Sequence, residues 1–188
     1  MAAAGHTGDL ATARAGRTSD DPAVRATALA ALERLAQLDD GELAAALTDP
    51  AVTVRRRAAQ LAAGHPEVDL RAALDDPDPA VVEMASWAAG EHGAVRDEVL
   101  DRLLALAGGA DEPLVREAAV AALGALGDER AVPVIVRATT DKPAIRRRAV
   151  LALAPFDGPE VDHAVERALG DRDWQVRQAA EDLRRAQR

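Results

Sequence analysis

The chain has 188 residues, of which 48% are hydrophobic and 29% charged, and its formal net charge at pH 7 is −9. This length suits one domain of ordinary size or a short array of repeats. The charged fraction leaves enough apolar side chains for a core and argues against wholesale disorder. Aromatic residues make up only 2% and alanine is abundant, which disfavours a β-sandwich or β-barrel and favours an all-α fold.

The composition also disfavours several functional classes. The chain has no cysteine, which excludes disulfides, thiolate nucleophiles and cysteine-ligated metal sites. It has no apolar run near the roughly 20 residues of a membrane span, and its first residues lack the basic-then-apolar order of a signal peptide. We therefore expect a cytoplasmic protein without membrane contact. The acidic balance argues against general nucleic-acid binding, because phosphate contacts supply most non-specific affinity.

A turn followed by an aliphatic residue recurs six times along the chain. We call these aliphatic residues the anchors, and they are Val24, Val54, Val81, Val115, Ile145 and Val176. Their spacings are 30, 27, 34, 30 and 31 residues, and the residue four positions after each anchor is alanine in all six repeats. At about 100° per residue the anchor and the positions 4, 7 and 8 residues later share one face, so each anchor predicts an amphipathic helix.

A second, less regular helix is expected before each anchor helix. In chain order these helices are expected at residues 8–15, 43–47, 66–74, 95–106, 130–137 and 159–169. The turn aspartates are predicted N-caps, namely Asp20, Asp49, Asp76, Asp111, Asp141 and Asp171. Glycines are predicted at the helix ends, namely Gly64, Gly90, Gly93, Gly124 and Gly127. Residues 108–113 give the longest loop signal and predict a hinge.

No single helix pair of this size can bury its apolar face alone, so the pairs must stack on one another. Six pairs predict about twelve helices in one repeat array over residues 1–188. Residues 1–7 are expected to fray. The last helix, predicted at 175–188, is polar where the earlier helices are apolar, as in a terminal cap.

Repeats four and five resemble those of a known family. Residues 127–137 read GDERAVPVIVR and are followed by Asp141, Pro143, Ile145-Arg146 and Ala149, and this string resembles the short HEAT-like repeat of the phycobilisome-lyase type. The resemblance is specific in repeats four and five and covers nearly the whole chain. It implies a right-handed α-solenoid of about six two-helix repeats, whose second helices line the concave face. It also implies a scaffold or adaptor, since a minority of the family are enzymes.

Arginine follows the anchor in five repeats, as Arg25, Arg55, Arg116, Arg146 and Arg177. This position lies within the apolar face, where an unpaired guanidinium is costly. We therefore predict a ladder of Arg–carboxylate pairs with the turn aspartates Asp49, Asp111, Asp141 and Asp171. Anion binding by these arginines is the alternative. Val82 replaces the arginine in repeat three, which predicts a break in the ladder, through either a degenerate repeat or a functional surface.

Positions 2, 3 and 6 residues after the anchor point away from the apolar face and predict a partner-binding surface. The predicted set is Arg56, Arg57, Gln60, Glu83, Met84, Trp87, Glu117, Arg147 and Arg148. Tryptophan beside methionine and arginine is typical of interface hot spots. The alternatives are that Trp87 fills a gap in the alanine-rich core and that the arginines are a solvated face. Trp174 replaces the usual proline and is predicted to pack over the last repeat, or else to be an exposed anchor for a partner.

The sequence offers little evidence for a set of catalytic or metal-binding residues. No two of the four histidines stand three or four residues apart, so we expect no metal and no cofactor. Deoxyhypusine hydroxylases, which are HEAT-repeat enzymes, use repeated His-Glu pairs, whereas this chain has one reversed pair, Glu91-His92. Neither Ser19 nor Ser86 has a neighbouring histidine, and no glycine-rich phosphate loop is present.

The sequence thus predicts a scaffold or adaptor that binds a protein partner on the concave face, and it favours a monomer. One alternative is a HEAT-like enzyme, either a bilin lyase or a DNA glycosylase for alkylated bases. Trp87 with Arg147 and Arg148 has a superficial likeness to the glycosylases, but a chain with a net charge of −9 lacks their basic channel. The other alternative is a structural subunit of a larger assembly, which would use Trp174, Arg184 and Arg185 at its edge.

Overall fold

A computed structural model describes residues 9–186. Within this range the chain forms twelve α-helices and two short 3-10 helices, and it forms no strand. The predicted fraying of residues 1–7 and the last two residues of the predicted cap lie outside the described residues. None of the helices between residues 9 and 186 is both long and apolar enough to span a membrane.

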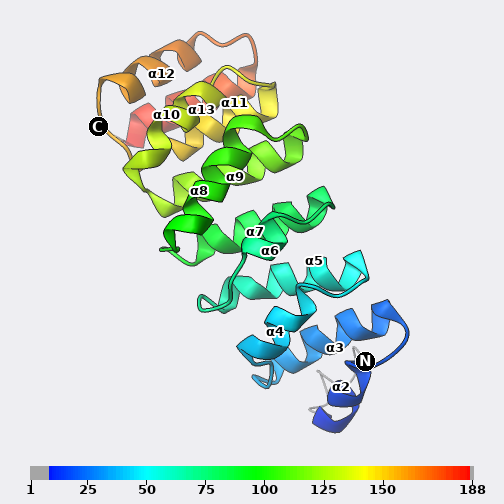
Figure 1. The fold of residues 1–188 in the computed structure, drawn as a ribbon. Helices are drawn as coiled ribbons and strands as arrows, with labels where there is room; N and C mark the ends of the chain where they lie inside the picture. Colours follow the sequence, from blue (N-terminus) through cyan, green and yellow to red (C-terminus); the bar gives the residue numbers. More distant parts are fainter. Residues whose placement is uncertain (1–8, 187–188) are drawn as a thin grey trace. The chain divides into compact units, whose positions relative to one another are not determined.

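The chain divides into two compact units, unit 1 at residues 1–88 and unit 2 at residues 89–188. The elements of unit 1 are α2 (Leu10–Gly16), α3 (Pro22–Arg34), α4 (Asp40–Ala46), α5 (Val52–Leu61), η1 (Ala62–Gly64), α6 (Arg71–Leu74) and most of α7 (Pro79–Glu91). Anchor helix α3 packs on anchor helix α5, while α2 packs on α3 and α4 packs on α5 (Figure 1). Unit 1 is therefore a stack of helix pairs.

Unit 2 repeats the same arrangement. After the end of α7 its elements are α8 (Asp97–Gly109), α9 (Pro113–Leu126), η2 (Glu129–Ala131), α10 (Val132–Ala138), α11 (Pro143–Ala152), α12 (Pro159–Leu169) and α13 (Trp174–Ala186). The anchor helices α9, α11 and α13 form one layer, and α8, α10 and α12 form the other (Figure 1). The predicted all-α fold of stacked two-helix repeats is confirmed.

The core lies between the two layers and follows the repeated pattern of the sequence. The alanine four residues after the anchor is 0% exposed in every repeat, and five of the six anchors are buried as well. A methyl side chain at this position lets neighbouring helices approach closely, and each buried apolar group adds to stability in proportion to the area removed from water. Leucines supply most of the remaining core volume, among them Leu32, Leu43, Leu74, Leu103 and Leu123.

Two predicted helix ends are wrong, because Gly90 and Gly124 lie inside α7 and α9. A Cβ on Gly124 would lie 2.6 Å from both Cα and Cβ of Ala152 in α11. Glycine at this point therefore allows close approach of two anchor helices rather than a change of direction. Gly127 does end α9, with the left-handed φ of 65° that favours glycine at a helix C-terminus.

The predicted aspartate N-caps are also displaced. The N-cap of α5 is Ala51, and the Asp49 carboxylate accepts a hydrogen bond from the Ala51 backbone N–H at 2.8 Å. In α3 the N-cap is Asp21 rather than Asp20. The turn aspartate thus stabilises the turn before the helix.

Two further predicted boundaries are wrong. Half of the expected hinge at 108–113 is helix, because α8 continues to Gly109, α9 begins at Pro113 and only residues 110–112 connect these closely packed helices. Burial of one face of α8 outweighs the low helix propensity of its two glycines. The helix expected at 66–74 is reduced to Arg71–Leu74, because the chain forms a turn after His65 before α6 begins.

Candidate functional site

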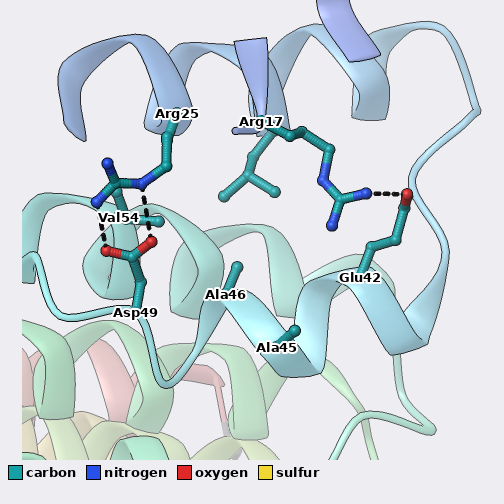
Figure 2. Close-up of a pocket in the computed structure, with 8 residues that line it drawn as sticks. Arg17, Arg25, Glu42, Ala45, Ala46, Asp49 and Val54 are labelled. Atoms are coloured by element: carbon teal, nitrogen blue, oxygen red, sulfur yellow. Dashed lines mark hydrogen bonds and ion pairs between the residues drawn. The ribbon is translucent and has the colours of Figure 1, made fainter. Parts of the chain in front are cut away.

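Arg25, the arginine after the first anchor, binds two separate segments of the chain, and Figure 2 shows its ion pair with Asp49. Its Nε and Nη2 donate to the two carboxylate oxygens of Asp49 at 2.9 and 2.8 Å. Its Nη1 donates to the backbone carbonyl of Ser19 at 2.8 Å, in the turn before α3. Arg25 therefore joins its own turn to the turn of the next repeat with a bidentate ion pair.

The same geometry recurs in three more repeats. Each arginine binds the turn aspartate that lies 21 to 25 residues further along, at 2.6–3.0 Å, and the pairs are Arg55–Asp76, Arg116–Asp141 and Arg146–Asp171. The prediction omitted Asp76 from the ladder. Its position five residues before the anchor Val81 matches that of Asp49 before Val54 and could have identified it.

In each of these ion pairs the arginine and the aspartate satisfy one another's charge. Hydrogen bonds from the paired arginines lower the pKa values of Asp49, Asp141 and Asp171 below the ordinary aspartate value. The most enclosed arginine, Arg146, is only 6% exposed. Because the guanidinium donors already point at carboxylates and carbonyls of the protein, the four paired arginines hold repeats together and are not available to an external anion.

Two members of the predicted ladder lack the expected partner. Asp111 has no arginine counterpart in α7, because the buried Val82 occupies that position. Arg177 in α13 binds the backbone carbonyls of Asp171 and Arg172 through Nη1, at 2.7 and 3.2 Å. No aspartate between residues 9 and 186 pairs with it.

The predicted partner-binding residues of unit 1 lie on α5 and α7. Arg56 and Gln60 are exposed, and Nη1 of Arg57 donates to Oε1 of Gln60 at 2.8 Å. Trp87 is 44% exposed, so the surrounding alanines do not enclose its ring. Two further members, Glu83 and Met84, are half-buried.

The predicted residues of unit 2 lie on α9 and α11. Glu117 and Arg148 form an ion pair across the two helices, with 3.7 Å between Nε and Oε1. Arg147 is exposed, and so is Leu151, which occupies the predicted outward position six residues after the anchor Ile145. Leu151 stands six residues after its anchor, as Trp87 does in α7, and it adds apolar area beside Arg147.

Trp174 is 65% exposed at the first position of α13, so the prediction that it packs over the last repeat is wrong. The row of buried residues in α13 begins two positions later, at Val176. The ring therefore lies outside the packed face of the helix.

A shallow pocket in unit 1 is lined by the Arg25–Asp49 pair, Arg17, Glu42 and small side chains of α4 (Figure 2). Arg17 and Arg14 both form ion pairs with Glu42. Every charged side chain that lines the pocket already takes part in an ion pair, so the pocket offers a ligand no unpaired charged group.

The imidazole of His65 lies between two carboxylates of unit 1. Its Nδ1 is 2.6 Å from Oδ1 of Asp40 in α4, and its Nε2 is 3.0 Å from Oε2 of Glu33 in α3. With both ring nitrogens engaged, no lone pair remains for a metal ion. Residues 9–186 contain no cluster of three or more side chains suited to hold one. The hydroxyl of Ser86 is buried in α7 without a hydrogen-bond partner, so no base among residues 9–186 contacts it.

We expect the stability of unit 1 to fall as the pH rises from about 6.5 through the raised pKa of His65. Burial lowers the pKa of His65, but hydrogen bonds to Glu33 and Asp40 outweigh it and raise the pKa above its ordinary value. A raised folded-state pKa means that the stabilisation is complete below the unfolded value of about 6.5 and is lost above it. Urea denaturation of the full chain at several pH values measures this, and His65→Gln should flatten the dependence. The exposed His163 is the control, since His163→Gln should leave the dependence unchanged.

Comparison with known proteins agrees with this architecture. A family model of HEAT repeats matches residues 40–124, 67–154 and 100–184. No curated protein matches the chain. A solved structure of the Escherichia coli protein YibA is 15% identical, with a TM-score of 0.65 over 90% of this chain and 67% of that chain. An engineered protein is 18% identical, with a TM-score of 0.62 over 92% of this chain and 94% of that chain.

A designed armadillo repeat protein in complex with the peptide (KR)4 is also similar, with 17% identity and a TM-score of 0.62 over 95% of this chain and 99% of that chain. At these identities the structures share the fold alone. The three matches to the family model together span residues 40–184, a range that includes three of the four Arg–Asp pairs and five of the six buried alanines. The chain therefore belongs to the HEAT-repeat family.

Proposed function

We propose that the chain is a scaffold or adaptor that binds a protein partner on the exposed side of its anchor helices. Unit 1 carries one such surface on α5 and α7, and unit 2 carries another on α11. The observation that carries the proposal is Trp87, whose large ring stays 44% exposed on a helix that is otherwise well packed. Exposed tryptophan is costly to leave in water and is enriched at interface hot spots. HEAT and armadillo repeats are in general protein-binding folds.

The charges on this surface favour a partner that carries carboxylates. Arg56 and Arg147 are exposed and form no ion pair within the described residues. Arginine binds carboxylates with two parallel hydrogen bonds, which adds geometric specificity to the attraction. The designed armadillo protein described above was solved with a basic peptide. Arginines at these positions would repel such a peptide, so we propose an acidic partner here.

Removing this surface should strongly reduce partner recovery without unfolding the chain. The test is affinity purification with quantitative mass spectrometry on the full chain carrying Arg56→Glu, Arg147→Glu and Trp87→Ala. Loss of hot-spot contacts worth about 2 kcal/mol or more should reduce recovery of the specific partner by roughly 30-fold.

The matched control carries two charge reversals away from the anchor-helix surface, Arg96→Glu and Arg137→Glu, and should retain the partner. Circular dichroism establishes that both variants are folded. Equal recovery of every protein with both variants would contradict the proposal, as would the absence of any partner specific to the unmodified chain.

A further inference from the structure

Arg177 lies at the edge of unit 2, beside the turn between α12 and α13, and backbone carbonyls of that turn fix its orientation. The Nη1 atom of Arg177 binds the carbonyls five and six residues before it, at 3.2 and 2.7 Å. The Nη1 atoms of Arg25, Arg55 and Arg116 bind the equivalent carbonyls of their own turns at 2.6–3.2 Å. The guanidinium of Arg177 is therefore held as it is in the paired repeats.

Arg177 differs from the paired arginines at the Nε and Nη2 atoms of its guanidinium. In the four complete pairs Nε and Nη2 bind both oxygens of an aspartate. In Arg177 these two atoms have no acceptor within residues 9–186. Since the backbone carbonyls already hold the side chain, a carboxylate arriving here would meet two parallel donors at a low cost in side-chain entropy.

The neighbouring side chains suit an acidic ligand. Trp174 is 65% exposed and lies three residues before Arg177, so the two share one side of α13. Arg167 and Arg172 are exposed and form no ion pair within the described residues. Together with the Arg146–Asp171 pair they line a shallow pocket at the same turn. The carboxylate of Asp171 is taken by Arg146, and that of Asp173 accepts the Gln175 backbone N–H at 2.9 Å. Asp173 and Glu181 keep their negative charges, but the three arginines Arg167, Arg172 and Arg177 outnumber them, so a small local excess of positive charge stands on a chain whose net charge is −9.

The far part of α13 argues against a stacked second copy of this chain. Five residues after the anchor, α9 and α11 bury Val120 and Val150, whereas α13 has the exposed Glu181. A full repeat stacked on α13 would bury that carboxylate, which is costly without a partner. The occupant must therefore contact the first turns of the helix only.

We propose that this edge binds an acidic turn of a partner protein, whose aspartate or glutamate side chain completes a fifth ion pair with Arg177. Trp174 covers the apolar part of the bound segment, and Arg167 and Arg172 attract its negative charge. This surface lies on α12 and α13 and is separate from the proposed partner surface on α5, α7 and α11.

The chain itself supplies a probe for this site. Residues 73–81, ALDDPDPAV, form the turn whose Asp76 pairs with Arg55 in unit 1. A synthetic peptide of this sequence is titrated into the full chain carrying Trp87→Phe, so that Trp174 is the fluorescent reporter. We expect a saturable change in fluorescence. The same peptide with Asp76→Asn loses the charge-assisted pair and should bind about tenfold more weakly.

Two protein variants separate the oriented arginine from simple charge attraction. Arg177→Gln should weaken binding of the acidic peptide about tenfold. Arg184→Gln removes one positive charge from the same helix and should change binding by less than about threefold, because exposed charges contribute little. Circular dichroism establishes that each variant is folded.

Three results would overturn the proposal. They are no binding of the acidic peptide at millimolar concentration, equal binding of the peptide with and without the Asp76→Asn change, and equal losses in the two arginine variants. The variant of the proposed partner surface, with Arg56→Glu, Arg147→Glu and Trp87→Ala, should bind the peptide as the unmodified chain does. Failure of one proposal can therefore be told from failure of the other.

Discussion

Asp171→Ala is expected to destabilise unit 2 by about 3 kcal/mol. Asp171 binds Nε and Nη2 of Arg146 at 2.8 and 2.7 Å, and it also accepts the Asp173 backbone N–H at 2.8 Å. Removing it leaves the guanidinium of Arg146, which is 6% exposed, without its carboxylate. Urea denaturation followed by circular dichroism measures the loss of stability.

Asp111→Ala is the matched control for this result. Asp111 is a turn aspartate of the same repeat pattern, but it is exposed and has no arginine partner within the described residues. Its removal should change the free energy of unfolding by no more than about 0.5 kcal/mol. Adding Arg146→Met to Asp171→Ala should recover at least half of the loss, because the buried unpaired charge is then gone. Similar effects of Asp171→Ala and Asp111→Ala would show that the ion pair does not stabilise the stack.

Gly124→Ala is expected to destabilise unit 2 by about 2 kcal/mol. In an isolated helix the same change would stabilise by about 1 kcal/mol, since alanine has the higher helix propensity. The tertiary contact reverses this sign. The new Cβ would lie 2.6 Å from Cα of Ala152 and 2.9 Å from its carbonyl oxygen, so α9 and α11 must separate.

Gly109→Ala tests the intrinsic effect of the same substitution. Gly109 ends α8, and a Cβ placed on it meets no atom within 4 Å. This variant should be neutral or more stable by up to about 1 kcal/mol. If both substitutions raised the thermal unfolding temperature, the close contact between α9 and α11 would be excluded as the reason for glycine at position 124.

The repeats could be predicted from the sequence because helical periodicity is a local property. A valine or isoleucine followed four residues later by alanine predicts one buried face wherever it occurs. The arginine after the anchor is predictable for the same reason, since a charge within an apolar face requires a partner. The identity of that partner is not local. Arg55 binds Asp76 across 21 residues and Arg25 binds Asp49 across 24, because the intervening second helices differ in length.

The sequence by itself therefore determined the class of fold, the six repeated helix pairs and the residues that form the core. Tertiary packing alone decided the helix ends, the role of Gly124 and the exposure of each tryptophan. The pattern predicts that Trp174 packs over the last repeat, with an exposed anchor as the alternative, and its ring is 65% exposed. An exposed and a core position fit Trp87 equally well by pattern, and its ring is 44% exposed. The reason is physical. Propensity and periodicity act within a helix, whereas close approach and exposure depend on atoms of neighbouring helices that lie far away in the sequence.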